Sequence, residues 1–331
     1  MAQEKSKSFR NSVRLVGYLK ETTLEERVAQ NGKHFITGKV IVAVNEFNTQ
    51  RVSFLVFEED NKEKYDALKK FLPENTISIA SYIKSTENKA NFATATGMAA
   101  KVWVMAGFEE FVSRSGEREK TMINLKGFSM GACDPDKTFN PTAEFEVDCY
   151  FESLTDEVEN DEPTGRLLVN VIVPAYKELV YRIPMVAPVE DNVAKYLKGQ
   201  YKVGDTARIK GQLVAMKVEI ANDNEEETEC FGKQMEKQVT TRFIRENVIL
   251  SGPKKPIEQG AEGSITTEMV KKGLALRETL MDENGQKRAK AIANKENNQE
   301  EPAEKPAPVK QKLETAPAQD GSSANPEDLD F

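Results

Sequence analysis

Basic and aromatic side chains alternate with small or branched apolar ones in two stretches of the sequence. The stretch KVWVMA places Lys101 and Trp103 on one face of a strand, because successive side chains of a strand point to opposite faces. The stretch ARIKG places Arg208 and Lys210 on one face in the same way. The apolar side chains between them suit a barrel interior, so we expect the basic and aromatic ones to face outward.

Cations beside flat rings are what a single-stranded nucleic acid requires of a binding surface. Positive groups contact the phosphates, and aromatic rings stack with bases of any sequence. The outward faces of the two stretches therefore predict a DNA-binding surface that includes Lys101, Trp103, Arg208 and Lys210. The alternative for Trp103 is that it packs beneath the long segment 59–100.

A third predicted strand in each half adds further candidates. In QRVSFLVF, Arg51 and Phe57 share one face, and we expect Phe54 on the opposite face to be a core residue. In the second half, the corresponding candidates for DNA binding are Tyr176, Tyr181 and Arg182. An ordinary solvated hairpin would explain this group equally well.

The sequence carries no pattern that signals catalysis. His34 is the one histidine, and no serine or cysteine pattern accompanies it. Neither a Walker-type loop nor a GxGxxG turn is present, and the acidic residues cluster in polar arms such as 156–162 and 225–229. We therefore expect no enzyme activity, no catalytic residue, no metal and no cofactor.

Composition and charge limit the possible classes of protein. The net charge of −8 means that an anion-binding surface must be a local cluster of cations. The chain contains no run of about 18 apolar residues and no apolar secretory segment at its start, so we expect a cytoplasmic protein without a membrane span. Three cysteines, far apart, suit a reducing compartment.

Alternation and turn residues predict the same order of elements in both halves. In the first half we expect a helix at 60–72 and a loop at 85–99. The strands there are expected at 12–20, 34–45, 50–57 and 76–84, followed by a hairpin over 101–131. In the second half we expect strands at 142–153, 166–173 and 179–186, a short helix at 191–197 and closing strands within 203–252.

Five strands with a helix between the third and fourth is the order of an OB barrel. We therefore predict an all-β protein with minor helices, built from two tandem OB-fold-like five-stranded barrels. A helix over 266–293 is expected in spite of Gly273 and Gly285. The expected domains are an OB domain at 1–135, a second at 136–252, a linker with a helix at 253–293, and a disordered acidic tail at 294–331.

The chain ends in an acidic tip that closes on an aromatic residue. One interpretation is a disordered end that only increases solubility. The other is a tethered peptide whose terminal ring enters an apolar pocket of a partner while its carboxylates contact basic residues. The tip residues are Asp328, Leu329, Asp330 and Phe331.

These patterns resemble the single-stranded DNA-binding proteins of bacteria and their phages. The resemblance is carried by NSVRLVGYLK at 11–20, a turn and strand at 31–45, the strand at 52–57, the stretches 102–106 and 207–211, and the Phe-ended tip. Three features differ from that family. Its commonest form has one OB fold per chain, the segment 59–100 is longer than expected here, and this chain has Asp330 where that family usually has proline.

The resemblance implies a sequence-tolerant protein that protects single-stranded DNA and has no enzyme activity. It also implies that the tip recruits replication, recombination or repair proteins. The tandem arrangement and the size favour a phage protein, which would act in the cytoplasm of a bacterial host. The alternatives are a nuclease or metal enzyme that contains OB barrels, and an interaction protein whose barrels bind no nucleic acid.

Overall fold

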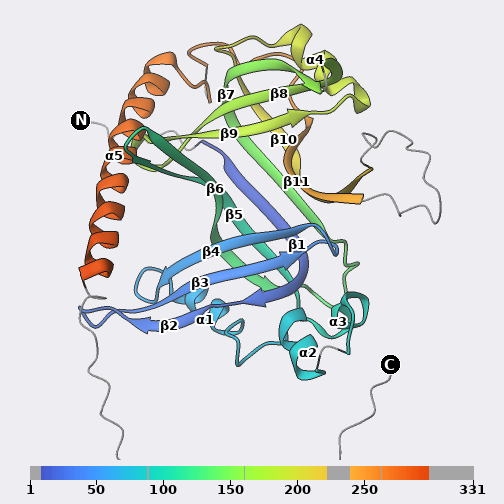
Figure 1. The fold of residues 1–331 in the computed structure, drawn as a ribbon, viewed down its shortest axis with the longest axis vertical. Helices are drawn as coiled ribbons and strands as arrows, with labels where there is room; N and C mark the ends of the chain where they lie inside the picture. Colours follow the sequence, from blue (N-terminus) through green and yellow to red (C-terminus); the bar gives the residue numbers. More distant parts are fainter. Residues whose placement is uncertain (1–8, 88, 160, 222–238, 262, 298–331) are drawn as a thin grey trace, which may run out of the picture. The chain divides into compact units, whose positions relative to one another are not determined.

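The structure is a computed structural model that describes residues 9–87, 89–159, 161–221, 239–261 and 263–297 (Figure 1). The chain divides into two compact units, Met1–Lys287 and Arg288–Phe331, and the contacts described below lie within the first. Strands dominate and helices are few, so the predicted all-β class with minor helices is confirmed. The predicted disordered tail falls almost entirely outside the described residues.

The first barrel is a closed ring of five strands in the order β1, β3, β4, β6, β5. The β4–β6 pairing is parallel and the other pairings in the ring are antiparallel. An additional strand, β2, pairs with β3 outside the ring. The bounds are β1 Asn11–Thr22, β2 Glu25–Val28, β3 His34–Ala43, β4 Thr49–Phe57, β5 Lys101–Ser115 and β6 Arg118–Ala132.

The second barrel repeats this ring in the order β7, β8, β9, β11, β10. Its β9–β11 pairing is parallel, at the position that β4–β6 holds in the first barrel. The predicted pair of OB-like five-stranded barrels is thus observed, with the same connectivity in both. The bounds are β7 Thr142–Glu159, β8 Glu162–Pro174, β9 Val180–Ala187, β10 Thr206–Ala221 and β11 Val239–Ser251.

The two barrels are joined through their first strands. Residues 11–16 of β1 pair antiparallel with residues 142–147 of β7, so the sheet runs from one barrel into the other. The rings of Phe108 and Phe145 meet edge to face at 5.6 Å, within a core that contains residues of both barrels. The domain boundaries near 135 and 252 stay predictions, because both barrels belong to one compact unit.

Helices lie between the third and fourth strands of each barrel, as predicted. The first barrel has α1 (Lys62–Lys69), α2 (Ile79–Ser85) and α3 (Phe92–Met98), and the second has α4 (Val193–Gln200). The expected strand at 76–84 is wrong, because Ser78 and Ser81 form a capping box that starts α2 there. The expected loop at 85–99 is also wrong in part, since Asn91 caps α3 by accepting a hydrogen bond from Thr94 N–H.

The predicted helix after the second barrel is confirmed as α5 (Thr267–Asn297). Its two glycines are explained by close packing. A Cβ atom at Gly273 would lie 2.4 Å from the Val180 side chain, and one at Gly285 would lie 1.8 Å from the Arg114 carbonyl oxygen. The part of α5 up to Lys287 therefore lies close to β9 of the second barrel and to the β5–β6 hairpin of the first.

Candidate nucleic-acid interface

The outer surface of β3 and β4 combines rings and cations. Register pairs place Phe35 opposite Phe57, and Arg51 opposite Ile41, with their side chains on the outside of the barrel. The inward positions of the same strands, such as Val52 and Phe54, are buried as the alternation predicts. We call this surface the β3–β4 face. Its outward residues are Phe35, Thr37, Lys39, Ile41, Arg51, Ser53, Leu55 and Phe57.

The β3–β4 face presents apolar and cationic groups without a carboxylate among its outward residues. The rings of Phe35 and Phe57 lie 5.3 Å apart, and Leu55 is 52% exposed. Lys39 and Arg51 are exposed, and within the described residues neither side chain makes an ion pair. Both cations are therefore free to contact an anion.

Strand β6 extends this face at its parallel edge. Ser53 of β4 and Lys126 of β6 are register partners, so Lys126 points to the same side and lies 3.3 Å from Glu109. The residue after Lys126 is a glycine because a Cβ atom at Gly127 would lie 2.2 Å from the buried ring of Phe54. The next outward residue, Phe128, is exposed. The edge thus adds an exposed ring and a cation that is paired with Glu109.

A second candidate surface crosses the junction between the barrels on β5, β1, β7 and β10. Three hollows of about 450, 370 and 580 Å³ follow one another there. The first two share Arg14 and Glu144, and the last two share Glu146, Lys210 and Ser251. We call the three together the interbarrel trough. It contains Trp103 at one end and Arg208 at the other.

Most cations of the trough are neutralised by carboxylates on β7. Arg208 forms two hydrogen bonds with Asp148, at 2.6 and 2.9 Å, and hydrogen bonding to this carboxylate raises the pKa of the guanidinium. Glu146 lies 3.0 Å from Arg10 and 3.7 Å from Lys210. The predicted site residues Arg208 and Lys210 face outward as expected, but each has an anionic partner.

The strands of the second barrel that correspond to β3 and β4 are partly covered. Ile172 on the outer side of β8 and Val180 at the start of β9 are both buried. They pack against Ile265, which precedes α5, and against Val270, near the start of α5. The predicted residue Arg182 pairs with Glu152 at 2.7 Å. This face therefore offers less free surface than its counterpart in the first barrel.

The two predicted tyrosines of the second barrel have different surroundings. Tyr176 is 82% exposed, and the Nζ atom of Lys177 lies 5.5 Å from the centre of its ring. Tyr181 packs against the core, and its burial raises the pKa of its hydroxyl to about 12. Tyr176 is thus available for stacking, whereas much of the Tyr181 ring is used in packing.

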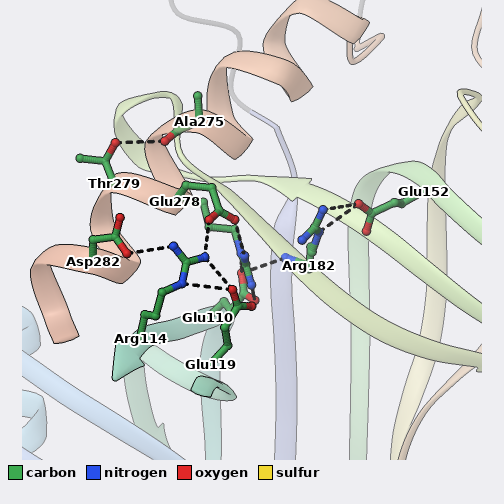
Figure 2. Close-up of polar contacts among 10 residues, drawn as sticks. Glu110, Arg114, Glu119, Glu152, Arg182, Ala275, Glu278, Thr279 and Asp282 are labelled. Carbon is green, nitrogen blue, oxygen red and sulfur yellow. Dashed lines mark hydrogen bonds and ion pairs between the residues drawn. The ribbon is translucent and has the colours of Figure 1, made fainter. Parts of the chain in front are cut away.

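Figure 2 shows a cluster around Glu110 and Arg114 that sequence reasoning did not identify. The side chains of Arg277 on α5 and Glu110 on β5 are 6% and 1% exposed, and they form hydrogen bonds of 2.7 and 2.9 Å. Glu110 also accepts a hydrogen bond from the backbone N–H of Arg182 on β9. Arg114 contacts carboxylates on its own hairpin and on α5, namely Glu119, Glu278 and Asp282. The cluster joins both barrels to α5.

The structure therefore separates the predicted DNA-binding residues into three groups. Arg51 and Phe57 share the β3–β4 face, while Trp103, Arg208 and Lys210 line the interbarrel trough, with Lys101 beside it. The third group lies on the second barrel and comprises Tyr176, Tyr181 and Arg182. The predicted tip, Asp328 to Phe331, lies outside the described residues.

Two further features concern other classes of site. Within the described part of the chain, no group of three or more His, Cys, Asp or Glu side chains is placed to hold a metal ion. The helices described here are all too short or too polar to cross a membrane.

Comparison with known proteins identifies a family over most of the chain. A family model described as YorF matches residues 10–287. No curated protein matches. Two crystal structures of the single-stranded DNA binding protein from Thermus aquaticus are similar at low identity. A deletion mutant has 12% identity and a TM-score of 0.45 over 76% of this chain and 97% of that chain. The wild type has 11% identity and a TM-score of 0.40 over 76% and 96%.

Proposed function

The chain belongs to the YorF family, and we propose that it is a non-enzymatic, sequence-tolerant single-stranded DNA-binding protein. The proposal rests mainly on the β3–β4 face. Strands two and three of an OB barrel are those that bind oligonucleotides in this fold, and β3 and β4 hold those positions in the first barrel.

The chemistry of the β3–β4 face suits a single strand. Phe35 and Phe57 offer rings on which bases stack, and each stacked base contributes about 1–3 kcal/mol to binding. Lys39 and Arg51, without ion-pair partners among the described residues, contact phosphates. Stacking and phosphate contacts do not depend on base identity, so binding tolerates any sequence. In a duplex the bases are stacked on one another and not available to these rings.

The proposal includes a role for the protein in DNA metabolism. A protein that covers exposed strands supports replication, recombination or repair, and the acidic tip from Asp328 to Phe331 recruits partner proteins of those processes. The combination of two barrels and such a tip favours a phage protein acting in the cytoplasm of its bacterial host. These parts of the proposal rest on sequence resemblance.

Fluorescence anisotropy with labelled oligo(dT), duplex DNA and RNA tests the proposal. We expect oligo(dT) to bind much more tightly than duplex of the same length, and its affinity to fall with salt at a log–log slope of about −0.7 for each phosphate contacted. Equal affinity for duplex, or no binding of oligo(dT) at low salt, would contradict the proposal.

Two additional arms of the same titration test its remaining parts. Incubation with Mg²⁺ separates binding from cleavage, since shortened oligonucleotides would support the alternative nuclease. A chain that lacks residues 325–331 should bind oligo(dT) as tightly as the full chain or slightly more tightly, because the tip carries negative charge. Weaker oligo(dT) binding by that variant would show that the tip contacts DNA.

A further inference from the structure

The end of the interbarrel trough nearest the first barrel forms a pocket of about 450 Å³. Trp103 projects into it from β5, and Arg14 and Val16 come from the neighbouring strand β1. The connection between the barrels supplies Asp134, Lys137 and Phe139, and the start of β7 supplies Glu144. A pocket of this size is within the range that encloses a small ligand. None of its lining residues comes from the segment 59–100.

The indole of Trp103 is held in place by a glycine. A Cβ atom at Gly131, the register partner of Trp103 on β6, would lie 2.6 Å from the indole ring. The ring therefore lies directly over the backbone of Gly131 and remains only partly buried. On the other side of the pocket, Phe139 is fixed by an edge-to-face contact with Tyr18 at 4.9 Å. Two aromatic residues are thus presented to one cavity.

Three cations and two carboxylates, Asp134 and Glu144, lie in or beside the pocket, and two of the cations form no ion pair with the described residues. Lys101 places its Nζ atom 5.0 Å from the centre of the Phe139 ring, and Arg14 lines the pocket from β1. Within the described residues neither side chain forms an ion pair, in contrast to Lys137, which lies 3.4 Å from Asp134. Arg14 and Lys101 therefore differ from Arg208 and Lys210, which form ion pairs with carboxylates in the rest of the trough.

We propose that this pocket binds one nucleotide unit of a single strand, with its base against Trp103 and Phe139 and its phosphate on Arg14 and Lys101. The inference rests on the proposed function and adds a second binding site to it. Planar bases stack on aromatic side chains, and unpaired cations beside the rings attract the attached phosphate. Thr138, Asn140 and Thr142 also line the pocket and provide hydrogen-bonding groups near the base edges.

The pocket is a site separate from the β3–β4 face. It involves β1, β5, β7, the last residue of β6 and the connection between the barrels, and it shares no outward residue of β3 or β4 with that face. A DNA strand that occupies both the pocket and the β3–β4 face would contact the first barrel on two sides. The two sites can therefore be tested independently, by removing one and measuring the other.

The fluorescence of Trp103, the only tryptophan of the chain, reports the occupancy of the pocket directly. We expect saturable quenching when the full chain is titrated with dTMP and with short oligo(dT), and no quenching with deoxyribose 5-phosphate, which lacks a base. The variant Arg14→Gln should require at least about fivefold more ligand for half-maximal quenching, and Arg27→Gln, on β2, should behave as the unmodified protein.

The failure of this inference and the failure of the proposed function give different results. Oligo(dT) that binds in anisotropy while Trp103 fluorescence stays constant would contradict the pocket and leave the proposed function intact. Absence of binding in both measurements would contradict both. In the variant Lys39→Ala/Arg51→Ala, quenching by dTMP should persist, and its loss would show that the pocket is not a separate site. Quenching by deoxyribose 5-phosphate equal to that by dTMP would overturn the assignment of a base.

Discussion

The buried pair of Arg277 and Glu110 links α5 to both barrels. Glu110 receives two hydrogen bonds from Arg277 and a third from the backbone of Arg182. Hydrogen bonding to Glu110 raises the pKa of the Arg277 guanidinium. Removal of one partner leaves the other charge buried and uncompensated.

The variant Arg277→Met tests this at the level of one residue. We expect it to lower the free energy of unfolding by about 3–5 kcal/mol, because breaking a buried ion pair leaves an unpaired charge. The double variant Glu110→Met/Arg277→Met should recover a large part of that loss. Urea denaturation followed by circular dichroism measures both.

The matched control is Arg27→Met, which removes an exposed arginine paired with Glu25. Such pairs contribute about 0–1 kcal/mol, so little change is expected. If Arg277→Met costs no more than this control, the buried pair does not hold α5 in place.

At the level of elements, sequence patterns predicted strands well and some helices poorly. Alternation in 101–106 and 207–211 correctly identified which side chains face inward, because strand geometry fixes that pattern locally. The segment 76–84 was misassigned because its isoleucines also fit a helix, and the capping serines decide the outcome.

Contacts between distant elements could not be predicted from the sequence. Nothing local indicates that Asp148 pairs with Arg208, since the two residues meet only when β7 and β10 are aligned. Likewise, the sequence groups the candidate site residues only strand by strand, whereas their division between the β3–β4 face and the trough follows from closure of the barrel. Glycine has a low helix propensity, so Gly273 and Gly285 argue against a helix in the sequence, yet they permit α5 to pack closely against Val180 and Arg114.

The variant Gly285→Ala tests the packing of α5. A methyl group there would lie 1.8 Å from the Arg114 carbonyl oxygen, so the helix and the hairpin must separate. We expect a loss of about 1–3 kcal/mol in the free energy of unfolding, as overpacking causes. The control Gly97→Ala, in α3, has open space around the new methyl group and should stabilise the protein by about 0.5–1 kcal/mol. Equal effects of the two substitutions would contradict close packing at Gly285.

Across the whole molecule, two barrels of the same connectivity are used differently. In the first, the outward surface of the second and third strands is open and carries Lys39 and Arg51, which form no ion pair with the described residues. In the second, the corresponding strands meet Ile265 and Val270, and Arg166 and Arg182 are paired with carboxylates. The net charge of −8 is therefore compatible with the proposed binding of a polyanion, because cations without an ion-pair partner among the described residues lie together on one face.

The central claim, that the β3–β4 face binds single-stranded DNA, is tested most directly by one pair of variants. Lys39→Ala/Arg51→Ala removes two cations from the face, and Lys195→Ala/Lys202→Ala removes two exposed cations at α4 of the second barrel. The measurement is oligo(dT) affinity by anisotropy at several salt concentrations. We predict that only the first variant loses affinity, by at least about tenfold at low salt, with a log–log salt slope smaller in magnitude by about 1.4. Equal losses in both variants, or no loss in the first, would contradict the account.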